Sequence, residues 1–188
     1  MSDVLYRIQF ANDQLAFKEL YEKKFFKLFQ FALAFVKSQL IAEELVNDIF
    51  LKLWNKRDKL DAIGNIDVYL YVAVKNASLN FLRRPEKKHV SLDEIEIEYL
   101  HISADPASVL ITSELKKIIE KAINSLPPRC RLVFKLIKED KLSYKEVAAI
   151  LNVSVKTVDT QLSIALKKLE GILSPVLDAP VTTTRAKS

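Results

Sequence analysis

The stretch from Leu142 to Leu169, LSYKEVAAILNVSVKTVDTQLSIALKKL, predicts two helices joined by a turn of three residues. Ser143 is a good N-cap for the first helix, and Glu146 follows where its carboxylate can accept a hydrogen bond from the cap's backbone amide. Asn152 tolerates the left-handed backbone conformation that a tight turn needs. Ser154 is expected to cap the second helix. The stretch is therefore typical of a helix-turn-helix.

The second of these helices has two faces of different chemistry. Aliphatic residues recur at steps of three and four on one face, namely Val155, Val158, Leu162, Ala165, Leu166 and Leu169. The other face carries short polar and charged side chains, namely Lys156, Thr157, Asp159, Thr160, Gln161 and Ser163. Side chains of this kind on a rigid helix reach base edges in the major groove. The pattern favours sequence-specific DNA binding over the simpler alternative, an amphipathic helix pair that only builds a core.

Composition limits the class of protein. The chain has 188 residues, 49% of them hydrophobic, which is enough for one domain or two small ones. Two glycines and few alternating apolar runs predict an all-helical fold. The net charge of +5 suits an anionic partner, and the single cysteine, Cys130, is expected to be a core residue in a reducing cytoplasm. No stretch resembles a signal peptide or a membrane span of roughly 20 apolar residues, so we expect a soluble cytoplasmic protein without membrane insertion.

Charge is distributed unevenly and predicts two domains. The segment 89–112 has no Lys or Arg but contains five carboxylates. We interpret it as an acidic linker between an N-terminal helical domain, 1–88, and a C-terminal helix-turn-helix domain, 113–174. A solvated loop without a function is the alternative for the linker. Residues 175–188 are expected to form a disordered tail.

Three helices are predicted in the N-terminal domain. Asp13 is expected to cap the first, whose apolar face holds Leu15, Phe17, Leu20, Tyr21, Phe25, Leu28, Phe29, Ala32 and Phe35. A second helix is expected over about 41–54, followed by a polar loop at 56–65. Asp67 is expected to cap a long third helix whose outer side carries Lys75, Asn76, Asn80, Arg83 and Arg84.

The C-terminal domain is expected to contain four helices. Asp105 and Pro106 supply a cap and a first-turn proline for the first of them. Pro127 and Pro128 end that helix and begin the next. The helix-turn-helix supplies the last two.

Four segments of the chain, in this order, resemble the extracytoplasmic-function (ECF) group of bacterial RNA polymerase sigma factors, over roughly residues 10–173. They are LYEKKFFKLFQFALAFVKS, AEELVNDIFLKLW, VYLYVAVKNASLNFLRR and LPPRCRLVFKLIKEDKLSYKEVAAILNVSVKTVDTQLSIALKKL. Other helix-turn-helix families would match only the last segment. The resemblance implies a transcription initiation subunit with no catalytic residues, no cofactor and no metal site.

The resemblance also implies two kinds of partner. The first domain of the family binds a coiled coil of the largest polymerase subunit, here through Glu43, Glu44, Asn47 and Asp48, and acidic side chains suit a basic surface. The second domain rests on the flap of the other large subunit, and the acidic linker threads polymerase channels. Family members are commonly held inactive by an anti-sigma factor.

Promoter DNA is the second kind of partner. In the family, the loop matching 60–66 holds a flipped base of the −10 element, and the helix that follows contacts the flanking DNA. The residues expected at the −10 element are Asn65, Lys75, Asn76, Asn80, Arg83 and Arg84, with the cations on phosphates and the amides on base edges. Those expected at the −35 element are Lys156, Thr157, Thr160, Gln161, Ser163 and Lys167.

The chain departs from the family at two positions on the last helix. Asp159 stands where many relatives have a basic or neutral residue; a carboxylate there repels phosphate but can accept from a cytosine amino group. Ile164 also replaces a residue that is often basic. We therefore expect fewer positively charged contacts to the −35 element than in relatives.

Two other functions are weighed against a sigma factor. A free-standing regulator would use the N-terminal domain for sensing or dimerisation, and it would bind a palindrome as a dimer. An enzyme is disfavoured, because His89, His101 and Cys130 show no metal-ligand spacing and the chain has no phosphate-binding glycine loop.

Overall fold

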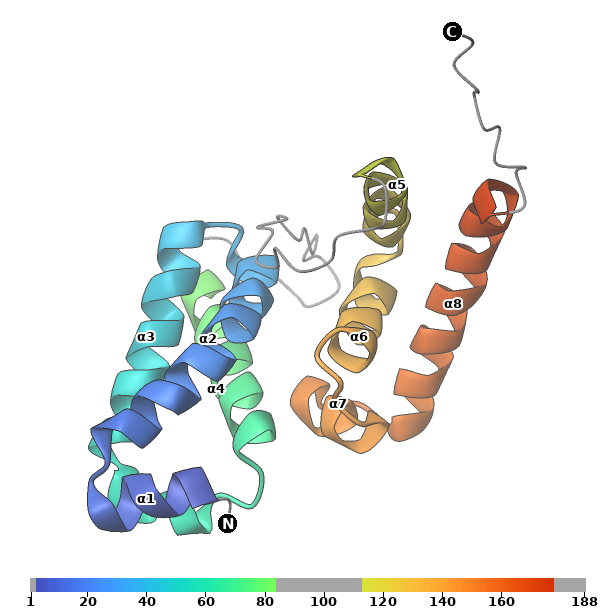
Figure 1. Cartoon of the computed structure of the whole chain (residues 1–188). Helices are drawn as coiled ribbons and strands as arrows, with labels where there is room; N and C mark the ends of the chain where they lie inside the picture. Colours follow the sequence, from blue (N-terminus) through green and yellow to red (C-terminus); the bar gives the residue numbers. More distant parts are fainter. Residues whose placement is uncertain (1–2, 84–112, 178–188) are drawn as a thin grey trace, which may run out of the picture.

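The computed structural model describes residues 3–83 and 113–177, and all regular secondary structure within these ranges is helical (Figure 1). The first range contains α1 Asp3–Ala11, α2 Gln14–Val36, α3 Gln39–Asn55, the 3-10 helix η1 Arg57–Ala62 and α4 Ile66–Leu82. The second range contains α5 Ser113–Asn124, α6 Pro128–Lys138, α7 Tyr144–Leu151 and α8 Val155–Leu177. The prediction of an all-α protein with two helical domains is confirmed.

Polar residues begin the long helices of the first lobe, residues 3–83. The Asp13 carboxylate accepts hydrogen bonds from two backbone N–H groups of the first turn of α2, at 2.9 and 3.0 Å, so this predicted cap is confirmed. α2 ends where Lys37 takes the left-handed conformation, with a φ of 53°. Ser38 then caps α3, because its hydroxyl accepts from the N–H of Ile41.

The apolar faces of α2, α3 and α4 pack into one core. Phe31 and Phe35 of α2 are 1% and 2% exposed and meet edge to face, with ring centroids 5.1 Å apart. Phe31 also meets Tyr71 of α4 edge to face. Burying a side chain of this size stabilises the fold by about 1.5–3 kcal/mol. The prediction for Leu15 is wrong: this residue is 69% exposed, because it lies about 140° around α2 from the buried Leu20.

The segment before α4 differs from the prediction in two ways. The expected loop at 56–65 contains the short helix η1. Asn65, rather than Asp67, caps α4: its backbone is extended and its side-chain oxygen accepts from the N–H groups of Asp67 and Val68 at 2.9 and 3.1 Å. Asp67 instead occupies the first turn, where a carboxylate interacts favourably with the helix dipole. Both residue types are good caps, so the sequence did not distinguish them.

The second lobe, residues 113–177, has a small core of its own formed by Ala122, Leu126, Cys130, Ala165 and Leu169. Cys130 is 3% exposed, which confirms its predicted core position. α6 begins at Pro128, where a missing N–H leaves no hydrogen bond unmade. α8 continues to Leu177, so the helix extends past the boundary predicted at 174. The linker 89–112, with the expected cap at Asp105 and Pro106, and Arg84 lie outside the described residues.

The two lobes pack against each other through α4 and α7. Val74 of α4 and Val147 and Ile150 of α7 are each 0% exposed and belong to one continuous cluster of buried side chains. In the described ranges, 3–83 and 113–177, none of the helices has the length and apolar character needed to cross a bilayer.

Candidate nucleic-acid interface

Local hydrogen bonds shape the helix-turn-helix of α7 and α8 as predicted. The Ser143 N–H donates to Glu146 Oε2 at 2.7 Å, and the Glu146 N–H donates to Ser143 Oγ at 3.3 Å, which together form a capping box. The bond from the Ser143 N–H lowers the pKa of the Glu146 carboxyl, and the Ser143 hydroxyl, which donates to the same oxygen at 2.7 Å, lowers it further. Asn152 takes the left-handed conformation, with φ 57° and ψ 51°. Ser154 Oγ then accepts from the Thr157 N–H at 3.0 Å and fixes the start of α8.

One face of α8 is packed and the opposite face is open. Val158 and Ala165 are both 0% exposed, and Leu162 and Leu169 lie on the same side. Val155 and Leu166 were predicted on this face, but they are 45% and 42% exposed. Leu166 lies about 70° around the helix from the middle of the buried line. Val155 lies about 50° from it and is the first residue of α8.

Five of the six residues expected at the −35 element are exposed on the open face of α8. They are Lys156, Thr157, Thr160, Ser163 and Lys167. The Thr160 hydroxyl donates to the carbonyl of Lys156 at 2.9 Å, so its remaining hydrogen-bonding capacity toward a ligand is as an acceptor.

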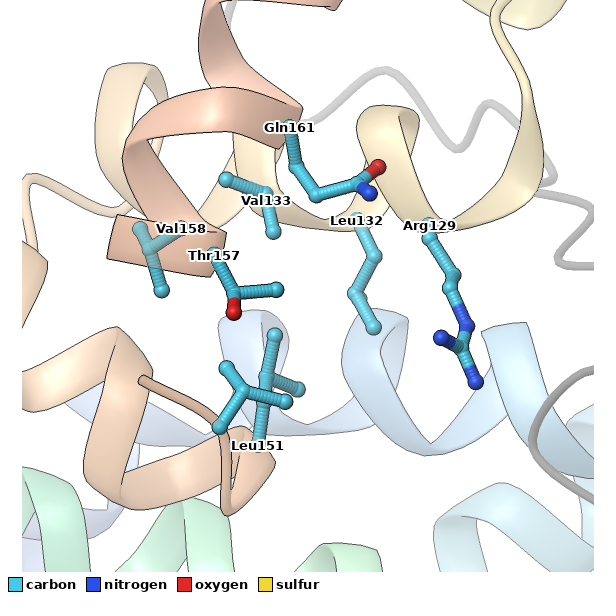
Figure 2. A pocket seen from close by; sticks show the side chains of 8 residues that line it. Arg129, Leu132, Val133, Leu151, Thr157, Val158 and Gln161 are labelled. Carbon is cyan, nitrogen blue, oxygen red and sulfur yellow. The ribbon is translucent and has the colours of Figure 1, made fainter. Parts of the chain in front are cut away.

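Gln161, the sixth residue, is turned toward α6 instead. Its Oε1 accepts a hydrogen bond from the buried Cys130 thiol, with an Sγ–Oε1 distance of 2.9 Å, and its side chain is half-buried. Figure 2 shows Gln161 extending over a groove that Leu132 and Val133 line from α6 and Val158 lines from α8. The groove encloses about 550 Å³, part of it open to solvent. Gln161 therefore does not point outward, as the sequence predicted, but toward α6.

Lys75 of α4 is also placed differently from the prediction. It was expected on the outer side of α4, but it is 7% exposed, and its Nζ donates to the carbonyl oxygen of Ile150 at 2.6 Å. Burial lowers the pKa of the Lys75 amine. The cause is tertiary: α7 of the second lobe covers this part of α4. Asn76, Asn80 and Arg83 are exposed as expected.

Further polar contacts join the two lobes. The Asn65 Nδ2 donates to Glu146 Oε1 at 2.7 Å, while the Asn65 oxygen caps α4. The Tyr71 hydroxyl donates to Asp140 Oδ2 at 2.7 Å, and Lys27 lies 3.8 Å from the other carboxylate oxygen. Burial raises the pKa of Asp140, and the Tyr71 hydrogen bond offsets part of this shift. In this closed arrangement, two of the residues expected at the −10 element, Asn65 and Lys75, are bonded to the second lobe.

The residues expected to contact polymerase form a continuous exposed face on α3. Glu43, Glu44, Asn47 and Asp48 are all exposed, and Asn47 Oδ1 accepts from the Tyr21 hydroxyl at 2.8 Å. Two leucines that the sequence analysis did not single out, Leu40 and Leu51, lie on the same face and are 74% and 59% exposed. Their spacing of eleven residues returns to the same side of a helix, which is the signal that could have found them. Exposed apolar patches rimmed by polar side chains mark protein-binding surfaces.

A groove continues this face toward α2. Its lining residues are Gln14, Phe17, Tyr21, Asn47, Phe50, Leu51 and Trp54. The aromatic rings in it are packed tightly, with Phe17 and Trp54 centroids 4.9 Å apart, so the groove is a preformed surface of the folded lobe.

Comparisons with known proteins agree with this arrangement. The family described as Sigma-70 region 2 matches residues 20–88, and the family described as Sigma-70, region 4 matches residues 116–169. The ECF RNA polymerase sigma-E factor of Escherichia coli (strain K12) is 28% identical over 181 residues, which are 91% of this chain and 93% of that protein. The ECF RNA polymerase sigma factor SigW of Bacillus subtilis (strain 168) is 26% identical, over 80% of this chain and 85% of that protein.

Solved structures are similar along most of the chain. The sigma factor RpoE from Bartonella quintana, in complex with the anti-sigma factor NepR, has a TM-score of 0.60 and 25% identity over 84% of this chain and 96% of that one. CnrH, in complex with the cytosolic domain of CnrY, has a TM-score of 0.56 over 92% of this chain and 96% of that one; at 22% identity it supports the fold alone. The two sigma regions occur in the same order on the two lobes, and the chain belongs to the ECF group of RNA polymerase sigma factors, which act in transcription initiation.

Proposed function

We propose that this sigma factor binds core RNA polymerase through the exposed face of α3 and directs it to promoters with two separate DNA contacts. α8 enters the major groove of the −35 element, and α4 with the loop before it contacts the −10 element. Because its proposed partners are RNA polymerase and promoter DNA, the protein would act in the cytoplasm. The exposed row of polar side chains on α8 is the observation that carries this proposal.

The contacts at the −35 element follow from α8. Lys156 and Lys167 lie about 20° apart around α8 and therefore on the same side of it. Each can bind a phosphate, one at either end of the segment of α8 that enters the major groove. Thr160 and Ser163 lie between them, close to the base edges. Gln161 is not available in the same way, because its amide oxygen is held by Cys130.

The contacts at the −10 element require the lobes to separate. Asn76 and Asn80 of α4 and Arg83 at its end are exposed, whereas Lys75 and Asn65 are bonded to Ile150 and Glu146 of α7. We propose that polymerase binding pulls the lobes apart and frees these two side chains. The free chain would then bind −35 duplex weakly and −10 DNA only together with polymerase.

An anti-sigma factor is the second proposed partner. The Bartonella relative, at 25% identity, is described in complex with such an inhibitor. A protein that stabilises the closed arrangement of the lobes would prevent the −10 contact without needing to cover α8.

The proposed function is tested with the full chain and core RNA polymerase. We expect co-elution in gel filtration and new transcript starts from a promoter library in vitro. The double substitution Lys156→Ala and Thr160→Ala should abolish most of these transcripts and leave co-elution unchanged. The proposal is wrong if no complex forms, or if the chain alone binds a palindromic operator tightly, which is the behaviour of a free-standing regulator.

The lobe contact gives a separate prediction. Tyr71→Phe removes the hydroxyl that donates to the partly buried Asp140 carboxylate and leaves the ring in place. Hydrogen bonds to charged groups contribute about 1.5–3 kcal/mol, so the ratio of closed to open lobes should fall about 10-fold to 100-fold. Faster amide hydrogen exchange at the facing turns of α4 and α7 would report this change.

Tyr144→Phe is the matched control, since Tyr144 lies on α7 but is 39% exposed. Equal exchange rates in the two variants would show that the Tyr71 hydroxyl does not hold the lobes together.

A further inference from the structure

Two side chains on the open face of α8 cannot bind phosphate, because one is acidic and the other is apolar. Asp159 is exposed, and Ile164 is 44% exposed. At about 100° per residue, each lies about 70° from the outward line through Lys156 and Lys167, on opposite flanks. The two therefore flank the centre of the DNA-facing surface and are about 140° apart around the helix.

Asp159 offers only hydrogen-bond acceptors. An ionised carboxylate has no donor, and it is repelled by phosphate. Within residues 3–83 and 113–177, neither carboxylate oxygen of Asp159 is bonded to another group, so both remain available to a ligand. In the major groove, a carboxylate is matched by the N4 amino group of cytosine.

Ile164 offers a branched apolar surface. Nearly half of this side chain faces solvent, although its neighbour Ala165 is fully buried in the lobe. An exposed aliphatic group on a DNA-facing helix has one attractive partner in the major groove, the C5 methyl group of thymine. Water would otherwise cover this apolar area at a cost in free energy.

The positions of the two residues separate their contacts. Five residues of helix span about 7.5 Å, which corresponds to about two base-pair steps of 3.4 Å. Since Asp159 and Ile164 are also on opposite flanks, they meet different base pairs rather than one.

We propose that Asp159 and Ile164 determine base identity at the −35 element of this protein, with a cytosine facing Asp159 and a thymine facing Ile164. The inference rests on the proposed function, because it assigns specificity to the same α8 surface. The lysines supply affinity that does not depend on sequence, and these two residues supply selection between sequences.

The test begins with the element itself. The full chain in complex with core polymerase is used to select duplexes from a library randomised across the −35 region. We expect enrichment of one cytosine and one thymine at separate fixed positions. Each base is then altered singly: cytosine to 2-pyrimidinone, which lacks the N4 amino group, and thymine to uracil, which lacks the methyl group.

Each altered base should weaken binding of the unaltered protein about fivefold to tenfold. Asp159→Ala should abolish the sensitivity to 2-pyrimidinone and keep the sensitivity to uracil, and Ile164→Ala should do the reverse. Glu170→Ala is the matched control for Asp159→Ala, because Glu170 lies about 16 Å further along α8 than Asp159. Leu166→Ala is the matched control for Ile164→Ala, because Leu166 lies about 160° around the helix from Ile164. Both controls should keep both sensitivities.

Two results would overturn the inference and leave the proposed function intact. If Asp159→Ala strengthens binding to all duplexes equally, the carboxylate faces phosphate rather than a base. If uracil weakens the Ile164→Ala variant as much as the original protein, the isoleucine does not contact the methyl group. A complex that selects no −35 sequence at all would instead contradict the proposed function.

Discussion

Reversing the charge of Glu44 and Asp48 together, by Glu44→Lys and Asp48→Lys, is expected to lower the affinity for core RNA polymerase about 100-fold. Both carboxylates are exposed on α3, beside the exposed Leu40 and Leu51. Each substitution replaces an attraction to a basic partner surface with a repulsion. Fluorescence anisotropy of the labelled chain titrated with core enzyme measures the change.

A control for this variant is Glu22→Lys, a charge reversal at an exposed position of α2. Glu22 forms an exposed pair with Lys18 at 3.6 Å, and the loss of such a surface pair should have little effect on the fold. We expect unchanged polymerase affinity for the control. A similar loss in both variants would mean that general charge, rather than the α3 face, attracts the polymerase.

Ile150→Ala is expected to lower the free energy of unfolding by about 2–5 kcal/mol, which is a large part of the stability of a small protein. The Ile150 side chain is 0% exposed and belongs to the buried cluster that both lobes share. Removing it leaves a cavity between α7 and α4 that the surrounding helices can fill only partly. Urea denaturation followed by circular dichroism measures the loss.

Ile150→Val removes a single methylene and should cost about 0.5–1.5 kcal/mol. Comparing the two variants shows whether the loss of stability grows with the size of the cavity or follows from any substitution at this position. Equal losses for alanine and valine would show that the size of the cavity at this site does not determine stability.

Local features were predictable from the sequence to within a residue or two. The capping box of Ser143 and Glu146, the left-handed Asn152 and the cap at Ser154 all depend on hydrogen bonds between residues that are close in the chain. Such bonds form whatever the rest of the molecule does, so their sequence signatures are reliable. The helix-turn-helix could therefore be placed before the fold was known.

Features that depend on contacts between distant segments could not be predicted. Lys75 is polar and was expected outside, but it lies on the side of α4 that the second lobe covers. Gln161 was expected to face DNA, but Cys130 lies close enough to bind its amide oxygen. Helical periodicity predicts which residues share a face, and it does not predict which faces meet.

The candidate polymerase-binding face of α3 could be predicted from the sequence only in part. The acidic residues of α3 were identified through the family resemblance, whereas exposed Leu40 and Leu51 were found only in the structure. Exposure of a leucine is a tertiary property, because the same side chain would be buried if another helix packed there.

With the role that we propose for Lys75 at the −10 element, its bond to the Ile150 carbonyl makes promoter binding a competition inside one molecule. An amine that is engaged with α7 cannot hold a phosphate at the same time, so only chains with parted lobes are competent for the −10 contact. The measured affinity equals the intrinsic affinity multiplied by the competent fraction; if about 1% of chains are competent, the promoter is bound about 100-fold more weakly than its contacts alone would give. Substitutions buried far from any nucleotide can thus tune the strength of every promoter that this protein serves, all in the same proportion.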